Sequence, residues 1–129
     1  MMIHVVAAVI VQEGKVLLAK RPLDKHQGGK WEFPGGKREE GELPDVALKR
    51  ECLEELGIHL SRIELFESVE HNYLDKHVFI EFYKVESFSG EPTGLEGQAV
   101  EWVSLHQLNE LTFPEANLSI VNKLRQSFV

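Results

Sequence analysis

The sequence predicts a single domain of the α+β class, and three observations lead to this prediction. The chain has 129 residues, which suits one compact core, whereas two separate domains in this length would each be small and marginal. Hydrophobic residues make up 43% of the chain and charged residues 27%, an ordinary globular composition. Strand-like segments flank a helical segment, and a second helical segment closes the sequence. We therefore expect residues 1–129 to form one domain.

The first predicted element is a β-hairpin. Residues 5–11 and 15–21 are mainly β-branched and aliphatic, and the intervening segment Gln12-Glu13-Gly14 suits a turn. The first apolar run is too short to span a bilayer and lacks the basic flank of an export signal, so it indicates a buried strand. Residues 31–33 predict a further short strand that is ended by Pro34, Gly35 and Gly36.

Residues 44–56 predict a helix, because Pro44 suits the first helical position and Gly57 suits a C-terminal stop. Leu43 would be the N-cap, although leucine is a poor capping residue. At helical spacing one broad arc is apolar, and we expect it to be buried: Val46, Leu48, Cys52, Leu53 and Leu56. The acids Glu51, Glu54 and Glu55 gather on another arc.

The second half of the chain predicts three strands and a final helix. The strands are expected at residues 63–69, 77–85 and 99–103. The helix is expected at residues 115–128, where apolar side chains recur at helical spacing: Leu118, Val121, Leu124 and Phe128.

Charge is distributed unevenly along the chain. The net charge of −7 argues against binding to a nucleic acid polymer or to an anionic membrane. Residues 15–38 nevertheless carry seven basic and two acidic side chains, whereas residues 39–55 carry seven acidic ones. This arrangement suits an anionic substrate held partly by protein cations and partly by metal ions. The single cysteine, Cys52, allows no internal disulfide, which indicates a reducing compartment such as the cytoplasm.

The three glutamates of the predicted helix call for an explanation. Carboxylates at i, i+3 and i+4 spacing repel one another by about a few tenths of a kcal/mol per pair, so stability alone does not favour them. A solvated acidic face is the commonplace explanation. The alternative is a hard divalent cation such as Mg²⁺, which takes oxygen ligands and bridges to substrate phosphates.

The surrounding residues favour the cation. From Gly36 the sequence runs through five residues to Glu42, then through seven residues to Arg50-Glu51-Cys52-Leu53-Glu54-Glu55-Leu56-Gly57-Ile58. This segment resembles the Nudix box, Gly-x5-Glu-x7-Arg-Glu-U-x-Glu-Glu-x-Gly-U, in which U is apolar. All specified positions are filled, and Cys52 stands where an aliphatic residue is more usual. The resemblance implies the Nudix fold, a mixed β-sheet sandwiched between helices as an α/β/α sandwich, and a metal-dependent hydrolase.

Segments outside the box resemble one branch of this family, the MutT-type enzymes. They are Trp31–Lys37, Glu96-Gly97-Gln98 and Phe113-Pro114-Glu115-Ala116-Asn117. MutT-type enzymes hydrolyse 8-oxo-dGTP to 8-oxo-dGMP and pyrophosphate, which sanitises the nucleotide pool and prevents mutation. The resemblance therefore implies a small-molecule nucleoside triphosphate substrate and a cytoplasmic, monomeric enzyme that binds neither a nucleic acid polymer nor a membrane.

The resemblance also implies a metal site and its support. The expected ligands are the carboxylates of Glu51, Glu54, Glu55 and Glu96 and the backbone carbonyl of Gly35 or Gly36, with Mg²⁺ as the metal and Mn²⁺ as the alternative. Glu51, Glu54 and Glu96 are the expected catalytic residues. Glu51 is the first choice of general base and Glu96 the second, and the sequence does not decide between them. Arg50 and Glu42 are expected to support the site.

Four residues are expected to bind substrate: Arg21, His26, Phe33 and Asn117. Arg21 would bind phosphates through its planar guanidinium. His26 would touch the nucleotide, and Phe33 would line the base pocket. The Asn117 amide can accept a hydrogen bond from the N7–H of 8-oxoguanine while donating to O6, whereas ordinary guanine presents a lone pair at N7. Such a mismatch can discriminate by on the order of 10⁴.

Each of these residues also has an ordinary structural explanation: a solvated loop or strand end for Glu96 and Arg21, a core aromatic for Phe33, and a cap or turn for Asn117. Two other functions stay open. One is a Nudix pyrophosphatase for CTP or a methylated pyrimidine nucleotide, and the other is a non-catalytic Nudix domain that binds nucleotides.

Overall fold

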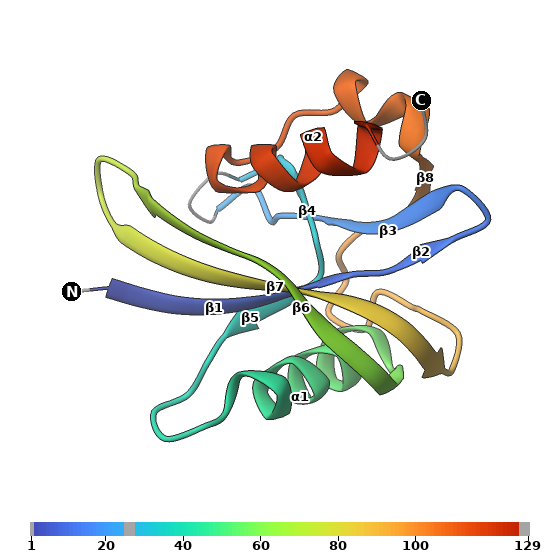
Figure 1. Ribbon diagram of the computed structural model, residues 1–129, viewed down its shortest axis with the longest axis horizontal. Coiled ribbons are helices and arrows are strands. Elements are labelled where there is room, and N and C mark those ends of the chain that lie inside the picture. The colour runs from blue at the N-terminus through green and yellow to red at the C-terminus, as the bar shows by residue number, and fades with distance from the viewer. Residues whose placement is uncertain (1, 25–27, 127–129) are drawn as a thin grey trace.

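The computed structural model describes residues 2–24 and 28–126, and in these residues the strands form two four-stranded sheets. Helix α1 (Pro44–Leu56) and helix α2 (Leu118–Gln126) lie on opposite sides of the strands (Figure 1). The predicted α+β class and the sandwich of strands between helices are confirmed. No helix within the described ranges is long and apolar enough to cross a membrane.

The first sheet is mixed and has the order β5-β1-β7-β6. Strand β1 (Met2–Val9) pairs in parallel with β7 (His77–Ser89) and antiparallel with β5 (Gly35–Lys37). Strand β6 (His59–Asn72) forms a long antiparallel hairpin with β7. Both hairpin strands are longer than the sequence predicts.

The second sheet is antiparallel around β3 (Lys15–Lys20). Its other strands are β2 (Val11–Gln12), β4 (Trp31–Glu32) and β8 (Val100–Ser104). The predicted first hairpin is thus only partly right. The turn at Glu13 and Gly14 forms, with both residues at positive φ, but only the two-residue β2 pairs with β3. The rest of the predicted first strand belongs to β1, because the chain leaves the first sheet at Ile10 and enters the second.

Strand β1 separates two apolar clusters because its side chains alternate between two faces. Ala7 and Val9 face the cluster that includes Ile120, Val121 and Leu124 of α2. Val6, Ala8 and Ile10 face the cluster that includes Leu48, Cys52 and Leu56 of α1. Each helix therefore covers its own core.

Helix α1 has the predicted ends. Pro44 opens it, Leu43 makes no side-chain cap, and Gly57 closes it in the left-handed conformation with φ of 71°. The predicted buried arc is partly wrong, because Val46 and Leu53 are 49% and 44% exposed. The helix is instead turned towards Ala47, which is fully buried and small enough to let α1 approach the sheet. Burial raises the pKa of the Cys52 thiol to about 12, so Cys52 behaves as an apolar core residue.

The last third of the chain has more short helices than predicted. A 3₁₀ helix at Leu105–Glu110 follows β8 and was not predicted. The final helix is split into a 3₁₀ turn, Glu115–Asn117, and α2. Phe128 lies outside the described residues.

The short strand predicted before Pro34 forms as β4 and ends at Glu32, but Gly35 and Gly36 then begin a strand that was not predicted, β5, which pairs with β1. Their missing side chains are what permits this pairing. A Cβ at Gly35 would lie 1.9 Å from the carbonyl oxygen of Val6. Glycine therefore brings β5, and the loop that follows it, close to β1.

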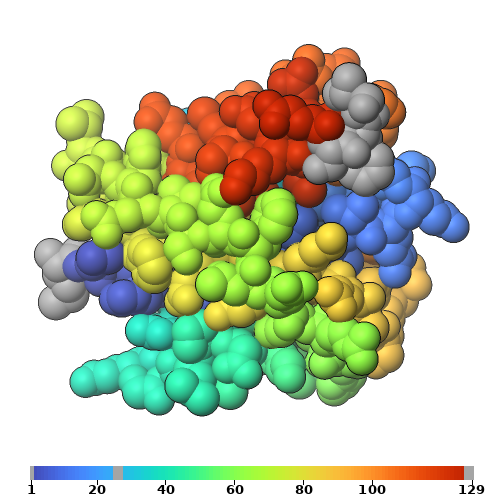
Figure 2. Space-filling model, viewed as in Figure 1, coloured from blue at the N-terminus to red at the C-terminus, as the bar shows by residue number. Residues whose placement is uncertain are grey.

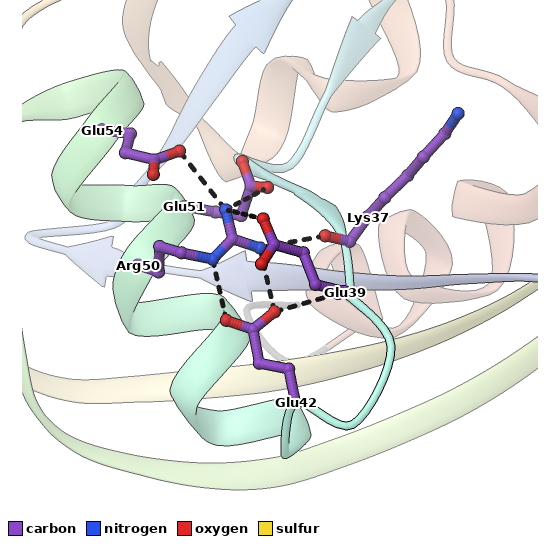
Figure 3. Close-up of polar contacts among 6 residues, drawn as sticks. All are labelled: Lys37, Glu39, Glu42, Arg50, Glu51 and Glu54. Carbon is purple, nitrogen blue, oxygen red and sulfur yellow. Dashed lines mark hydrogen bonds and ion pairs between the residues drawn. The ribbon is translucent and has the colours of Figure 1, made fainter.

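The loop between β5 and α1 is clamped by Arg50 (Figure 3). Arg50 Nε donates to Glu42 Oε2 at 2.8 Å and Nη2 donates to Glu42 Oε1 at 3.0 Å. The second nitrogen also donates to the carbonyl oxygen of Lys37 at 3.2 Å, and Glu42 Oε1 accepts from the amide of Glu39. These contacts lower the pKa of Glu42 to about 2, mainly through the hydrogen bonds from Arg50.

We expect Gly35→Ala to lower the free energy of unfolding by about 2–3 kcal/mol or more, because β5 must move away from Val6 to admit a Cβ. Urea denaturation measures this loss. Gly14→Asn is the control, since a Cβ at Gly14 meets nothing within 4 Å and asparagine tolerates positive φ. Equal stability of the two variants would contradict the close approach of β5 to β1.

Glu42→Gln should reduce the amount by which the free energy of unfolding falls between pH 4.5 and pH 2. The folded pKa of about 2 lies below the ordinary value of 4.5, so the stability that Glu42 contributes is present above pH 4.5 and is lost as the pH falls towards 2. Denaturation at successive pH values is expected to show a smaller loss over this range in the variant than in the parent. Parallel profiles would show that the Arg50–Glu42 contact does not form in solution.

Candidate active site

The packing of α1 on the sheet leaves some acids of the Nudix box partly buried and others exposed. Ala47, Glu51 and Glu55 follow one another at four-residue intervals and so lie on one line of the helix, beside the buried line of Leu48, Cys52 and Leu56. Glu51 and Glu55 are therefore partly buried against the sheet, whereas the Glu54 side chain is 54% exposed.

Of these carboxylates, Glu55 lies in the environment that is least favourable for a negative charge. Its Oε2 atom is buried and has no hydrogen-bond partner among the described residues. Burial raises its pKa, and a hydrogen bond with Glu51 and repulsion from the Glu51, Glu96 and Glu32 carboxylates act in the same direction. Glu55 also lies in the last turn of α1, where the helix dipole disfavours negative charge. The charged form of Glu55 thus needs a compensating cation.

Glu51 lies directly against β5. A Cβ at Gly36 would be only 2.5 Å from the Glu51 carboxyl carbon, so the missing side chain leaves room for this carboxylate. Arg50 Nη1 lies 3.1 Å from Glu51 Oε1 and 3.3 Å from Glu54 Oε2 (Figure 3). The predicted supporting residues, Arg50 and Glu42, thus join the β5–α1 loop to two of the three box carboxylates.

The Glu96 loop is brought to the C-terminal end of α1 by backbone contacts. The amide of Leu95 donates to the carbonyl oxygen of Glu55 at 3.0 Å, and Gln98 Nε2 donates to the same oxygen at 3.2 Å. Gln98 Oε1 in turn accepts from the amide of Glu96 at 2.9 Å. Gln98 therefore places Glu96 near Glu55, a role that sequence reasoning did not assign to it.

The donor set suits a hard divalent cation. The charges of Glu51 and Glu96 both act on Glu55, and the buried Oε2 of Glu55 lacks a partner among the described residues. The predicted ligands do not form a ready-made cage, because no three His, Cys, Asp or Glu side chains within residues 2–24 and 28–126 converge on one point. Glu54 turns towards Arg50 instead.

A pocket of about 160 Å³ opens beside this acidic cluster. Its walls are largely apolar and come from β1, β7 and the segment after β4: Ile3, Val5, Ala7, Val78, Ile80, Phe82 and Phe33. Gly36 lines the pocket on one side and contacts Glu51 on the other. The pocket and the Glu51 carboxylate therefore lie on either side of Gly36, a separation that suits a nucleotide with a flat base and a charged tail.

Asn117 supplies a polar group to this slot. It is 7% exposed and is the one polar residue in the buried set of the described chain. It lines the pocket at the end of the 3₁₀ turn before α2. Phe33, also in the pocket, packs edge-on against Phe82 and stacks with Phe113, so it is both a core residue and a pocket wall.

Arg21 lines the same pocket and is held by Glu32. Arg21 Nη1 donates to Glu32 Oε1 at 2.7 Å, and both side chains are little more than a quarter exposed. Sequence reasoning did not single out Glu32, although an acid within a strongly basic segment was the available signal. The predicted contact of Arg21 with phosphates stays a prediction. His26 lies outside the described residues.

Tyr73 and Lys76 complete the pocket from the tip of the β6–β7 hairpin. Sequence reasoning did not identify Tyr73, because it is separated from Asn117 by 43 residues and only the hairpin brings the two segments together. No local pattern in the sequence marks such a contact.

Comparison with known proteins agrees with this geometry. A model of the NUDIX domain matches residues 5–123. The chain is 43% identical over 115 residues to an 8-oxo-dGTP diphosphatase of Escherichia coli K12, covering 89% of each protein. It is 37% identical over 120 residues to a CTP pyrophosphohydrolase of the same organism, covering 93% of this chain and 89% of that protein.

A solved structure described as MutT from Aliivibrio salmonicida and Vibrio cholerae superposes with a TM-score of 0.86 at 36% identity, covering 98% of this chain and 99% of that one. The matched region includes the whole Nudix box, whose loop and helix adopt the arrangement given above. The chain therefore belongs to the Nudix family of hydrolases.

Proposed function

We propose that the chain hydrolyses 8-oxo-dGTP to 8-oxo-dGMP and pyrophosphate and so removes an oxidised nucleotide from the DNA precursor pool. The observation that carries the proposal is the placement of Asn117, a buried polar residue that lines the same pocket as Gly36, the glycine that leaves room for the Glu51 carboxylate. The similarity to the E. coli 8-oxo-dGTP diphosphatase supports it. The substrate is a small molecule, and we further propose that the enzyme acts as a cytoplasmic monomer without a nucleic acid or membrane partner.

In this proposal the base enters the slot between the strands and Asn117. The Asn117 carbonyl accepts from N7–H of the oxidised base while its amide donates to O6. Ordinary guanine offers an acceptor at N7, so the carbonyl would face a lone pair and binding would be weaker. Arg21, which donates to Glu32, lines the same pocket and would bring its guanidinium to the nucleotide phosphates.

Nudix hydrolases use a divalent metal ion, and here we propose Mg²⁺ with Mn²⁺ as a substitute. Glu51, Glu54, Glu55 and Glu96 would hold it, together with a backbone carbonyl of Gly35 or Gly36. When bound, the metal neutralises phosphate charge and makes the phosphorus more electrophilic. Glu54 would have to leave Arg50 to take part, which its exposed position permits.

Glu51 is the general base that we favour. Its carboxylate lies against Gly36, which lines the nucleotide slot, whereas Glu96 stands on an exposed loop. Glu51 would accept a proton from a water molecule as the water oxygen bonds to the β-phosphorus. The bond from that phosphorus to the oxygen bridging the α- and β-phosphates breaks, and the nucleoside monophosphate leaves with that oxygen.

A pyrimidine nucleotide is the second candidate substrate, because the chain is also similar to the E. coli CTP pyrophosphohydrolase. The two proposals differ in the partner they require of Asn117. Activity that is greatest on CTP, with none on 8-oxo-dGTP, would establish the second.

Glu54→Gln should lower turnover by at least about 10²-fold, because it removes a negative charge from the metal site while keeping size and helix propensity. Pyrophosphate release at saturating Mg²⁺ measures the effect. Asp45→Asn is the matched control, since it removes an exposed carboxylate from the same helix. Near-parental turnover of Glu54→Gln would contradict its assignment as a ligand.

Asn117→Ala should cost about 1–3 kcal/mol of transition-state binding for 8-oxo-dGTP and much less for dGTP, because only the oxidised base pairs well with the amide. The measurement is the ratio of kcat/KM for the two nucleotides in parent and variant. A parental ratio near one, or a ratio that Asn117→Ala leaves unchanged, would contradict the proposed recognition.

A further inference from the structure

The turn that contains Asn117 is stabilised by a side chain from another part of the chain. It is a 3₁₀ helix of only three residues, Glu115–Asn117, and its N-cap residue, Pro114, makes no side-chain cap. The first amides of a helix lack partners within the helix itself. Ala116 is 2% exposed, so its amide needs a protein acceptor. The hydroxyl of Tyr73 accepts this hydrogen bond at 3.0 Å.

Tyr73 comes from a different part of the chain, the turn that joins β6 to β7. Its own amide donates to the carbonyl oxygen of Lys76 at 2.8 Å, which closes that turn. Tyr73 lines the same pocket as Asn117. One side chain therefore forms a wall of the base slot and also holds the residue that precedes Asn117.

Two more contacts fasten β6 to the segment around Asn117. His71 Nε2 lies 3.1 Å from Glu115 Oε2, and the His71 ring packs edge-on against Tyr73 with ring centres 4.5 Å apart. Ser119 Oγ donates to Glu67 Oε2 at 2.7 Å. Figure 2 shows β6, in green, packed against α2, in red, along this seam.

We propose that Tyr73 is a positioning residue for substrate selection. Its hydroxyl fixes the backbone immediately before Asn117, so that the Asn117 amide meets the edge of the oxidised base in one orientation. The proposal rests on the function proposed above, because it assigns Tyr73 a part in the reading of that base. Without the hydroxyl, the Ala116 amide must find another partner and the turn shifts.

Tyr73→Phe tests this inference, because it keeps the aromatic wall and removes only the hydroxyl, which accepts from the Ala116 amide. We expect KM for 8-oxo-dGTP to rise about three- to tenfold, which is the range for loss of one hydrogen bond, while kcat for 8-oxo-dGTP and kcat/KM for dGTP stay near parental values. The Ala116 amide should also exchange faster with deuterium in the variant. Tyr83→Phe, at the other tyrosine of the chain, is the control and should change neither quantity.

The outcomes separate this inference from the proposed function. In an Asn117→Ala background, Tyr73→Phe should have no further effect on the ratio of kcat/KM for 8-oxo-dGTP to that for dGTP. If Asn117→Ala lowers this ratio and Tyr73→Phe does not, the inference is wrong and the proposed function stands. Equal losses on both nucleotides would show a merely structural role and overturn it too. If Asn117→Ala itself has no effect, the proposed recognition falls, and the inference with it.

Discussion

Two like-charged carboxylates of α1, Glu51 and Glu55, are partly buried where the helix packs on the sheet, and the surrounding residues are arranged around them. Burial and repulsion from Glu51 raise the pKa of Glu55, so Glu55 destabilises the fold in its charged form. The sequence around them offsets that cost. Gly36 leaves room for the Glu51 carboxylate, and Arg50 brings a guanidinium to Glu51, Glu54 and the β5–α1 loop. This arrangement supports our proposal that a divalent cation binds beside Glu55.

The two helices support different parts of the site, because successive side chains of β1 point alternately into the two apolar clusters. The face towards α1 supports the carboxylates, and the face towards α2 supports the apolar slot and Asn117. Strand β5 joins the two halves, since its glycines approach β1 closely and Gly36 borders both the slot and Glu51. The reacting phosphate and the recognised base would thus be positioned by separate layers that share one strand.

Short sequence patterns predicted the features that depend on neighbouring residues alone, such as the ends of a helix. Pro44 and Gly57 predicted both ends of α1, whereas the metal site expected from the spacing of the Nudix box stays a prediction. Patterns along the sequence could not show that α1 turns Ala47 towards the sheet, because the rotation of a helix depends on the surface it meets. Nor could they show that β1 and β2 separate at Ile10, or that Tyr73, at the turn between β6 and β7, accepts a hydrogen bond from Ala116 in the 3₁₀ turn before α2. Of the site, the sequence indicated the donors and Asn117, whereas Gln98, Glu32 and Tyr73 emerged only from tertiary contacts.

We propose that the carboxylates around Glu55 form a cation site and are not merely a strained helix end. Thermal unfolding of the parent and of Glu55→Gln, each in chelator and in excess Mg²⁺, distinguishes the two and needs no substrate. Mg²⁺ should raise the Tm of the parent by several degrees. Glu55→Gln should raise Tm in chelator, because it removes the cost of burying an acid that is charged in the unfolded chain, and it should abolish most of the gain from Mg²⁺. A parental Tm that is indifferent to Mg²⁺, or an equal gain in both proteins, would show that no cation binds at Glu55.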